Sequence, residues 1–289
     1  MVEERSRATL YCFYMKTMAY DDVGAGFPIV LIHGHPFNRT MWAPQTAFLG
    51  SQYRVIVPDL RGYGENLFDS EKTLLSGFAA DIFELLDSIG VGRFVLGGLS
   101  MGGQIVLECY RQFPARIAGL ILADTFAQLD TAERKQLRLD TANRLLAEGM
   151  KKYSIEELPR MIAPHHIRTM PSVADHILQM METTAPAGAA AALRGRAERI
   201  DYTPFLAQIE VPTLILVGDQ DSYTPVSDAR FMHERVRGSE LVVIEDAGHM
   251  PNLEQAASFN AAISAFLAGA VKLVPDSSRQ ESAKIGVPG

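Results

Sequence analysis

The chain has little of several residue types and patterns that would mark a specialised class of protein. Its 289 residues include only two cysteines, Cys12 and Cys109, which provide neither a metal-binding spacing nor a disulfide framework. No apolar run is long enough to span a membrane, and the charged N-terminus leads into no hydrophobic signal region. We therefore expect no metal, no cofactor and no membrane anchor, and a cytoplasmic location.

Basic residues are also scarcer than acidic ones. Lys and Arg number 27 against 34 Asp and Glu, which gives a formal net charge of −7. That balance disfavours nucleic acid or an anionic membrane surface as the main partner. The expected partner is a small molecule, and the sequence leaves the oligomeric state open, a homo-oligomer included.

Apolar segments of strand length alternate with segments of helical spacing along much of the chain. The expected strands are Leu10–Tyr20 (one or two strands), Pro28–Ile32, Tyr53–Val57, Arg93–Leu96, Ile117–Ala123, Pro212–Val217 and Leu241–Ile244. The expected helices are a segment from Asn38 or Thr40 to Phe48, then Thr73–Ile89, Gln104–Phe113, Val226–Arg235 and Leu253–Leu267. Asp21–Gly26 has the composition of a turn. This alternation predicts an α/β protein with a mainly parallel, doubly wound sheet.

The alternation stops between about Phe126 and Phe205, where the sequence predicts helices and no strand. Expected helices cover Thr131–Glu148, Ile155–Ile162, Ser172–Met181 and Ala187–Ile200. We expect residues 126–205 to form a helical cap, with 1–125 and 206–270 as the core. The polar residues 271–289 are expected to be a mobile tail. The methionines of the cap are either its own core or a flexible apolar pocket lining, and they are Met150, Met161, Met170, Met180 and Met181.

The segment Gly98-Leu99-Ser100-Met101-Gly102 lies between a predicted strand and a predicted helix. Glycines lack a Cβ atom, so the strand and the helix can approach closely around Ser100. A G-x-S-x-G turn in this context holds the serine hydroxyl at the end of a strand, exposed to a cleft. A serine hydroxyl is a poor nucleophile near neutral pH, so it needs a general base and a third group that orients the base.

His249 is the preferred candidate for the base, because it follows a strand end in a loop flanked by Gly248 and Pro251. Three aspartates that follow strands are candidates for the acid, and they are Asp221, Asp124 and Asp219. Asp221 lies further out on its loop and better suits reaching the outer nitrogen of His249. The order Ser, Asp, His agrees with this choice. His165 or His166 is a further candidate for facing the substrate.

Taken together, these motifs resemble the α/β-hydrolase superfamily. The matching segments, in family order, are His33-Gly34-His35-Pro36, Asp59–Gly64, Gly98–Gly102, Gly218–Asp221 and Gly248-His249, within about Thr17 to Leu267. The resemblance implies the α/β-hydrolase fold, with a mainly parallel eight-stranded sheet and a helical cap inserted after the sixth strand.

The resemblance also implies which backbone groups bind the oxyanion. One N–H belongs to Met101 and the other to His35, with Phe37 as an alternative donor. Phe37, Trp42 and Asp124 are candidate residues of the substrate pocket. The imidazole of His35 is a departure from the family pattern, and it either contacts the substrate or points away from it.

The resemblance favours a serine hydrolase that cleaves a carboxylic ester or lactone through an acyl-enzyme intermediate, similar to esterases and enol-lactone hydrolases. Relatives that act as epoxide hydrolases or haloalkane dehalogenases have aspartate where this chain has Ser100. An alternative is a carbon–carbon bond hydrolase, or another tailoring enzyme, with the same triad. A ligand-binding protein on a retired hydrolase fold is disfavoured, because every triad position is filled.

Overall fold

The computed structural model describes residues 18–66 and 70–273. Within them, seven strands form one sheet in the order β1-β3-β2-β4-β5-β6-β7. The strands are β1 (Tyr20–Val23), β2 (Pro28–Ile32), β3 (Arg54–Pro58), β4 (Phe94–Leu99), β5 (Ile117–Ala123), β6 (Thr213–Gly218) and β7 (Glu240–Ile244). β1 pairs antiparallel with β3, and the other neighbours pair in parallel. The mainly parallel sheet predicted from the sequence is confirmed.

The strand order reverses its direction at β2. From β2 the chain crosses to β3 on one side and then returns to β4 on the other. In open α/β sheets such a switch point leaves a crevice at the carboxyl ends of the strands, where ligands bind. The turns that follow β2 and β4 meet at this point, and they carry His35 and Ser100.

Two details of the sheet differ from the expectation. The described residues contain seven strands rather than eight, and most of the predicted strand Leu10–Tyr20 lies outside them. The turn expected at Asp21–Gly26 is shorter, because Tyr20–Val23 form β1 in register with β3. The ladder bonds and the ion pair between Asp22 and Arg54, at 2.7 Å, outweigh the turn composition of this segment.

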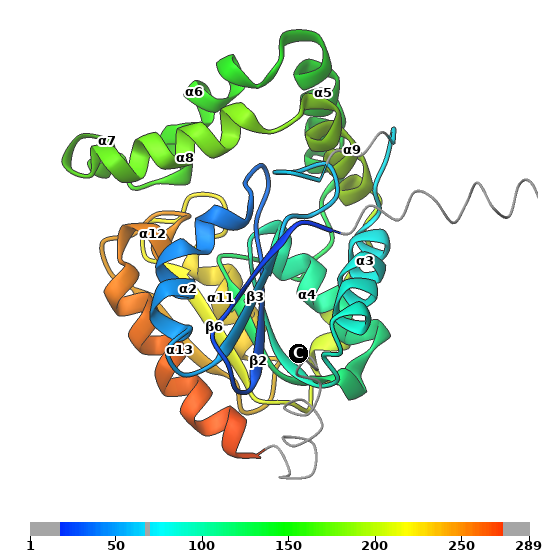
Figure 1. Ribbon diagram of the computed structural model, residues 1–289. Coiled ribbons are helices and arrows are strands. Elements are labelled where there is room, and N and C mark those ends of the chain that lie inside the picture. The colour runs from blue at the N-terminus through cyan, green and yellow to red at the C-terminus, as the bar shows by residue number, and fades with distance from the viewer. Residues whose placement is uncertain (1–17, 67–69, 274–289) are drawn as a thin grey trace, which may run out of the picture.

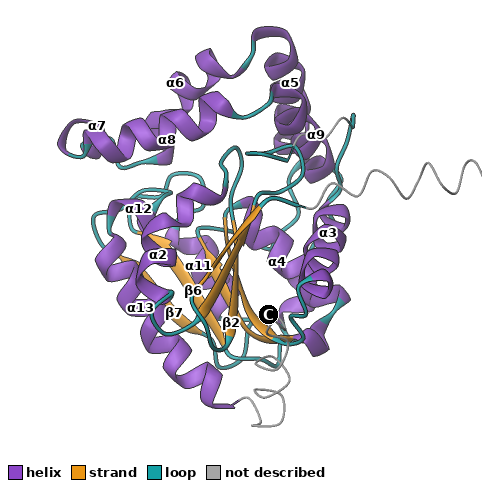
Figure 2. Ribbon diagram, in the orientation of Figure 1, coloured by secondary structure: helices purple, strands orange, loops and turns teal. Residues whose placement is uncertain are grey.

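Helices cover both faces of the sheet (Figure 2). On one face lie α3 (Leu75–Ser88), α4 (Met101–Gln112) and α11 (Val226–His233). On the other lie α2 (Ala43–Leu49), α13 (Ala256–Ala270) and the short helices Arg39–Trp42 and α12 (Pro251–Glu254). Side chains of β4 alternate between two buried clusters, with Leu96 in one and Val95 in the other, as the strand period of two requires.

The helix limits differ from the sequence expectation at two ends. The first expected helix is divided into the 3₁₀ helix Arg39–Trp42, whose first turn is capped by the side chain of Asn38, and α2. At the other end of the chain, Val271–Leu273 form a 3₁₀ helix rather than the start of a tail, and residues 274–289 lie outside the described residues. No helix in the described part of the chain has the length and apolar character needed to cross a membrane.

Between β5 and β6 the described chain is helical and contains no strand. The helices are α5 (Ala132–Glu148), α6 (Met150–Met161), α7 (His166–Thr169), α8 (Pro171–Thr183), α9 (Pro186–Ala197) and α10 (Thr203–Leu206). Figure 1 shows α5 to α9 above the carboxyl ends of the strands. α9 lies directly against the loop before α3, because a Cβ atom added to Gly195 would be 1.7 Å from the carbonyl oxygen of Thr73.

Candidate active site

Ser100 lies between β4 and α4 in a strained backbone conformation. Its φ is +57°, in the left-handed region that non-glycine residues rarely adopt. Glycines permit this turn, because a Cβ atom on Gly98 would be 2.4 Å from the backbone of Gly102, and one on Gly102 would be 2.2 Å from Ile32 O. The Ser100 N–H donates to Ala123 O at 2.9 Å, so the neighbouring strand holds the turn in place.

His249 and Asp221 come together from the loops after β7 and β6. His249 Nδ1 is 2.8 Å from Asp221 Oδ2, and both residues are buried. The backbone N–H groups of Tyr223 and Thr224 donate to Asp221 Oδ1 at 2.7 and 3.1 Å, and the Thr224 hydroxyl donates to Oδ2. These donors fix the orientation of the Asp221 carboxylate toward His249. His249 lines the same cavity as Ser100.

The two other candidate acids have different partners. Asp219 Oδ1 accepts a hydrogen bond from Ala247 N at 3.2 Å. Asp124 Oδ1 accepts one from Gly218 N at 2.9 Å, and its buried Oδ2 has no partner. Burial, followed by the nearby charge of Asp221, raises the pKa of Asp124 well above its usual value. Among the three aspartates, Asp221 is therefore the one bonded to His249.

The two backbone groups expected at the oxyanion site lie beside this turn. Met101 begins α4, and the first N–H groups of a helix have no partner within the helix. In the described structure neither the Met101 N–H nor the His35 N–H donates to a backbone acceptor outside α4. The Phe37 N–H donates to Gly34 O at 3.1 Å, so it is occupied within the turn and cannot serve as the alternative donor.

The side chain of His35 lines the cavity next to Ser100 and is 5% exposed. Its Nδ1 is 2.7 Å from the hydroxyl of Tyr63, and its buried Nε2 has no partner. Burial lowers the pKa of His35 well below its usual value, and the charges of Arg196 and Arg138 lower it further. The ring is therefore neutral at neutral pH and belongs to the lining of the cavity.

The substrate pocket differs from the one expected. Phe37, Trp42 and Asp124 do not line the cavity. Phe37 and Trp42 are buried in the cluster on the face of the sheet that α2 and α13 cover. Trp42 packs against Phe259 there, with ring centroids 6.1 Å apart. These aromatic residues follow the turn His33–Pro36 in sequence, but the 3₁₀ helix at Arg39–Trp42 directs Trp42 into the core.

The cavity has a volume of about 290 Å³ and opens over Ser100 and His249. Its other lining residues are His35, Phe126, Arg134, Leu137, Arg138, Thr141, Arg144, Tyr153, Glu157, Arg160, Met161, Leu193, Arg196, Ser222, Tyr223 and Thr224. Of the five methionines named from the sequence, Met161 alone belongs to this lining, and Met150, Met180 and Met181 are buried in packed clusters. The sequence analysis did not predict that arginines line the cavity. Arg134 and Arg138 are four residues apart on α5, and this spacing, which places both on one face of the helix, could have indicated it.

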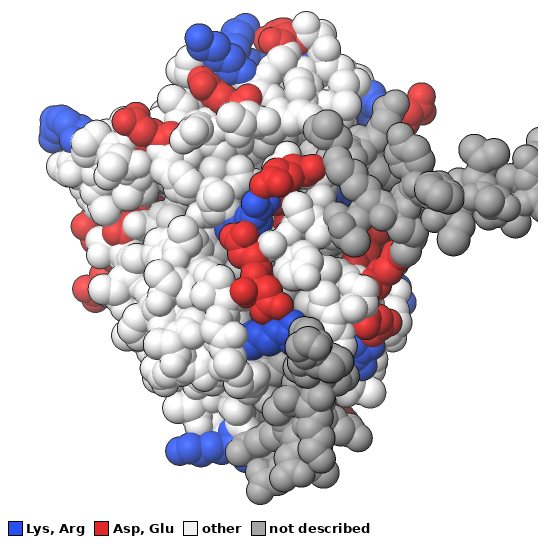
Figure 3. Space-filling model, in the orientation of Figure 1, with Lys and Arg blue, Asp and Glu red and all other residues white. Residues whose placement is uncertain are grey.

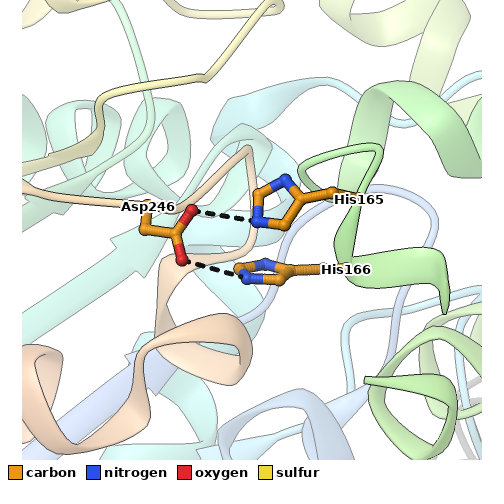
Figure 4. A group of neighbouring side chains, drawn as sticks. All are labelled: His165, His166 and Asp246. Atoms are coloured by element: carbon orange, nitrogen blue, oxygen red, sulfur yellow. Dashed lines mark ion pairs between the residues drawn. The ribbon is translucent and has the colours of Figure 1, made fainter. Parts of the chain in front are cut away.

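His165 and His166 do not line the cavity, in contrast to the substrate-facing role considered from the sequence. Figure 4 shows both rings directed toward Asp246, with Nε2 to carboxylate distances of 2.9 and 3.3 Å. His166 Nδ1 is also 2.9 Å from Glu254, a buried carboxylate that accepts hydrogen bonds from Gly248 N and Met250 N on both sides of His249. The His165–His166–Asp246 group has ligand types that could hold a cation. In the described structure these side chains form ion pairs with one another, and those pairs connect the segment between α6 and α7 to the loop that carries His249.

Comparison with known proteins identifies the family to which this chain belongs. The model of the alpha/beta hydrolase family matches residues 29–262, so the chain belongs to this family. The enol-lactonase of Burkholderia xenovorans LB400 has a solved structure with a TM-score of 0.81 at 27% identity, covering 87% of this chain and 96% of that chain. The fold and the family predicted from the sequence are confirmed.

More specific similarity is to proteins that act on esters and lactones. A 3-oxoadipate enol-lactonase of Acinetobacter baylyi is 30% identical over 230 residues, which are 80% of this chain and 84% of that protein. A thermophilic esterase from Thermogutta terrifontis, solved with malate bound, is 40% identical, with a TM-score of 0.85, and covers 88% of this chain and 93% of that one. The chain is an ester hydrolase of the α/β-hydrolase family.

Proposed function

We propose that this hydrolase cleaves a small carboxylic ester or lactone through a Ser100–His249–Asp221 triad. The observation that carries the proposal is the 2.8 Å contact between His249 Nδ1 and Asp221 Oδ2, in a cavity that Ser100 also lines. The carboxylate keeps the proton on Nδ1, which leaves the Nε2 lone pair free to act as a base.

In the proposed reaction, His249 takes the proton of Ser100 while Ser100 attacks the carbonyl carbon. The N–H groups of Met101 and His35 bind the tetrahedral oxyanion, and Asp221 stabilises the protonated imidazole. His249 then protonates the leaving alcohol and activates a water molecule, which releases the acyl group as a carboxylic acid. In a lactone the leaving alcohol stays covalently attached to the acyl group.

Residues 126–205 act in this proposal as a cap that sets substrate size. This role is supported by the helices that form part of the cavity wall. α5, α6 and α9 contribute Thr141, Met161 and Leu193 to the lining. The side chains of these helices, rather than the triad, would then decide which acyl groups fit.

A fluorophosphonate probe and p-nitrophenyl acetate hydrolysis test the triad. Ser100→Ala should lose both labelling and hydrolysis, and His249→Ala should lose labelling by at least about 10³-fold. Ser222→Ala is the matched control, because Ser222 also lines the cavity but has no described contact with His249. Undiminished turnover in Ser100→Ala would exclude the proposed nucleophile. Parallel assays with lactones and 1,3-diketones separate ester or lactone cleavage from carbon–carbon bond hydrolysis.

A further inference from the structure

Arg196 is a buried cation that forms no ion pair within the described residues. The residue is 7% exposed and lines the cavity that contains Ser100. Its Nε donates to Gln104 Oε1 at 3.1 Å, and no carboxylate of the described residues forms an ion pair with it. Burial, followed by the nearby charge of Arg138, lowers the pKa of this guanidinium, and the opposite charge of Asp130 offsets that effect only in part. An uncompensated buried charge is costly, so a ligand that neutralises it would gain a strong interaction.

The neighbouring arginines show what a neutralised guanidinium looks like in this protein. Arg138 binds both oxygens of Asp130, at 2.7 and 3.2 Å, and Arg199 lies 3.4 Å from the same carboxylate. Arg144, nearer to solvent, pairs with Glu148. Arg196 is therefore the buried arginine of the cavity wall that forms no ion pair with a carboxylate of the described residues.

Two side chains near Arg196, Gln104 and His35, each have a buried nitrogen without a partner in the described structure. An arginine Nε can only donate, so the Gln104 atom that faces it must be the amide oxygen. The amide nitrogen of Gln104 is consequently left buried and unpaired. The one hydrogen bond of the Tyr63 hydroxyl in the described structure is to His35 Nδ1. If the hydroxyl donates there, the proton of the neutral imidazole resides on Nε2, which is buried without a partner.

We propose that the cavity holds a carboxylate of the substrate at Arg196, so that the preferred substrates are esters or lactones that carry a free carboxylate group. The guanidinium supplies two N–H groups in the fork geometry that matches a carboxylate, and Gln104 fixes its orientation. With its proton on Nε2, His35 adds a neutral donor to the lining of the same cavity. This inference rests on the proposed function, because Ser100 must attack the ester carbonyl of the same molecule.

Two measurements test the carboxylate site. The first compares kcat/KM for mono-p-nitrophenyl glutarate, which carries a carboxylate, and for p-nitrophenyl pentanoate, a neutral ester of the same chain length. We expect the unmodified protein to prefer the glutarate ester. Arg196→Gln should lower kcat/KM for this ester by about 10- to 150-fold, as loss of a charged hydrogen-bond partner does, and change the neutral ester less than about threefold. Arg194→Gln, on the same helix but only partly buried, outside the cavity lining and bonded to Asn143, should leave the ratio unchanged.

The second measurement is calorimetric binding of glutarate to Ser100→Ala, which reports on the site without turnover and without altering Arg196. Saturable binding that Arg196→Gln in the same background abolishes supports the site. Absence of glutarate binding overturns the inference, as does an equal preference for the two esters that Arg196→Gln does not change. If the protein hydrolyses neither ester while its Ser100→Ala form binds glutarate, the proposed function fails and the carboxylate site stands.

Discussion

Replacing Asp221 by Asn tests the acid of the triad with a minimal change of shape. Asp221 Oδ1 accepts two backbone N–H groups, so the Asn oxygen will take that position. The Asn amide group then replaces Oδ2, which faces the Thr224 hydroxyl and His249 Nδ1. An amide nitrogen donates and does not accept, so the imidazole must present a lone pair at Nδ1 and carry its proton on Nε2. Nε2 can then no longer take the proton of Ser100.

The expected loss follows from this tautomer. An Asp-to-Asn change that leaves the triad geometry intact but fixes the wrong tautomer lowers kcat by about 10⁴ in serine hydrolases. This factor corresponds to about 5 kcal/mol of activation free energy. We expect thermal unfolding of Asp221→Asn to shift by only a few degrees, because all but one of the hydrogen bonds keep a partner.

Asp124→Asn is the matched control. The same burial and charge that raise the pKa of Asp124 favour its neutral form, which Asn imitates, and Asn keeps an acceptor for Gly218 N. We expect less than about threefold loss of kcat/KM for p-nitrophenyl acetate. Equal losses in the two variants would refute the assignment of the acid to Asp221, and so would Asp221→Asn with more than a tenth of the normal kcat.

Four other substitutions have defined outcomes. Burial lowers the pKa of His35 in the folded protein, so as the pH falls the imidazole is protonated more readily in the unfolded chain. The free energy of unfolding should therefore fall as the pH drops below the unfolded value of 6.5. His35→Gln should flatten that slope by up to about 1.4 kcal/mol per pH unit in denaturant titrations. Gly195→Ala should cost about 1–3 kcal/mol by pushing α9 off the loop before α3, whereas Gly269→Ala, with free space around its Cβ, should stabilise α13 by up to about 1 kcal/mol in the same titrations. Glu254→Gln should cost about 1–3 kcal/mol of unfolding free energy and lower kcat, because this buried carboxylate holds the backbone on both sides of His249.

The turn at Ser100 could be predicted from sequence because its geometry is local. A strand, a sharp turn and a helix within about a dozen residues place Ser100, and the glycines at 98 and 102 are required by backbone contacts of the turn itself. His249 and Asp221 were predictable for a related reason. The carboxyl ends of parallel strands lie along one edge of the sheet, so residues that follow different strands converge there.

The cavity wall could not be predicted in this way, because it depends on contacts between distant segments. Arg196 lies in an alanine-rich helix, where an arginine would ordinarily be read as exposed. Its burial follows from packing against Gln104, which is 92 residues away. The pairing of His165 and His166 with Asp246 depends in the same way on how α7 rests on the loop after β7. Local composition carries no information about either contact.

The net charge of the chain also fails to predict the lining of the cavity, and that lining affects which substrates can bind. The net charge of −7 is that of the whole chain, and on the face shown in Figure 3 basic side chains are scattered among acidic ones. The cavity has the opposite character, since five arginines and one glutamate line it. A large polyanion meets the outer surface and is repelled, whereas a small anion that enters the cavity meets Arg196 in a partly dry environment, where charge interactions are strong. The net charge therefore disfavours a nucleic-acid partner without disfavouring a small anionic substrate.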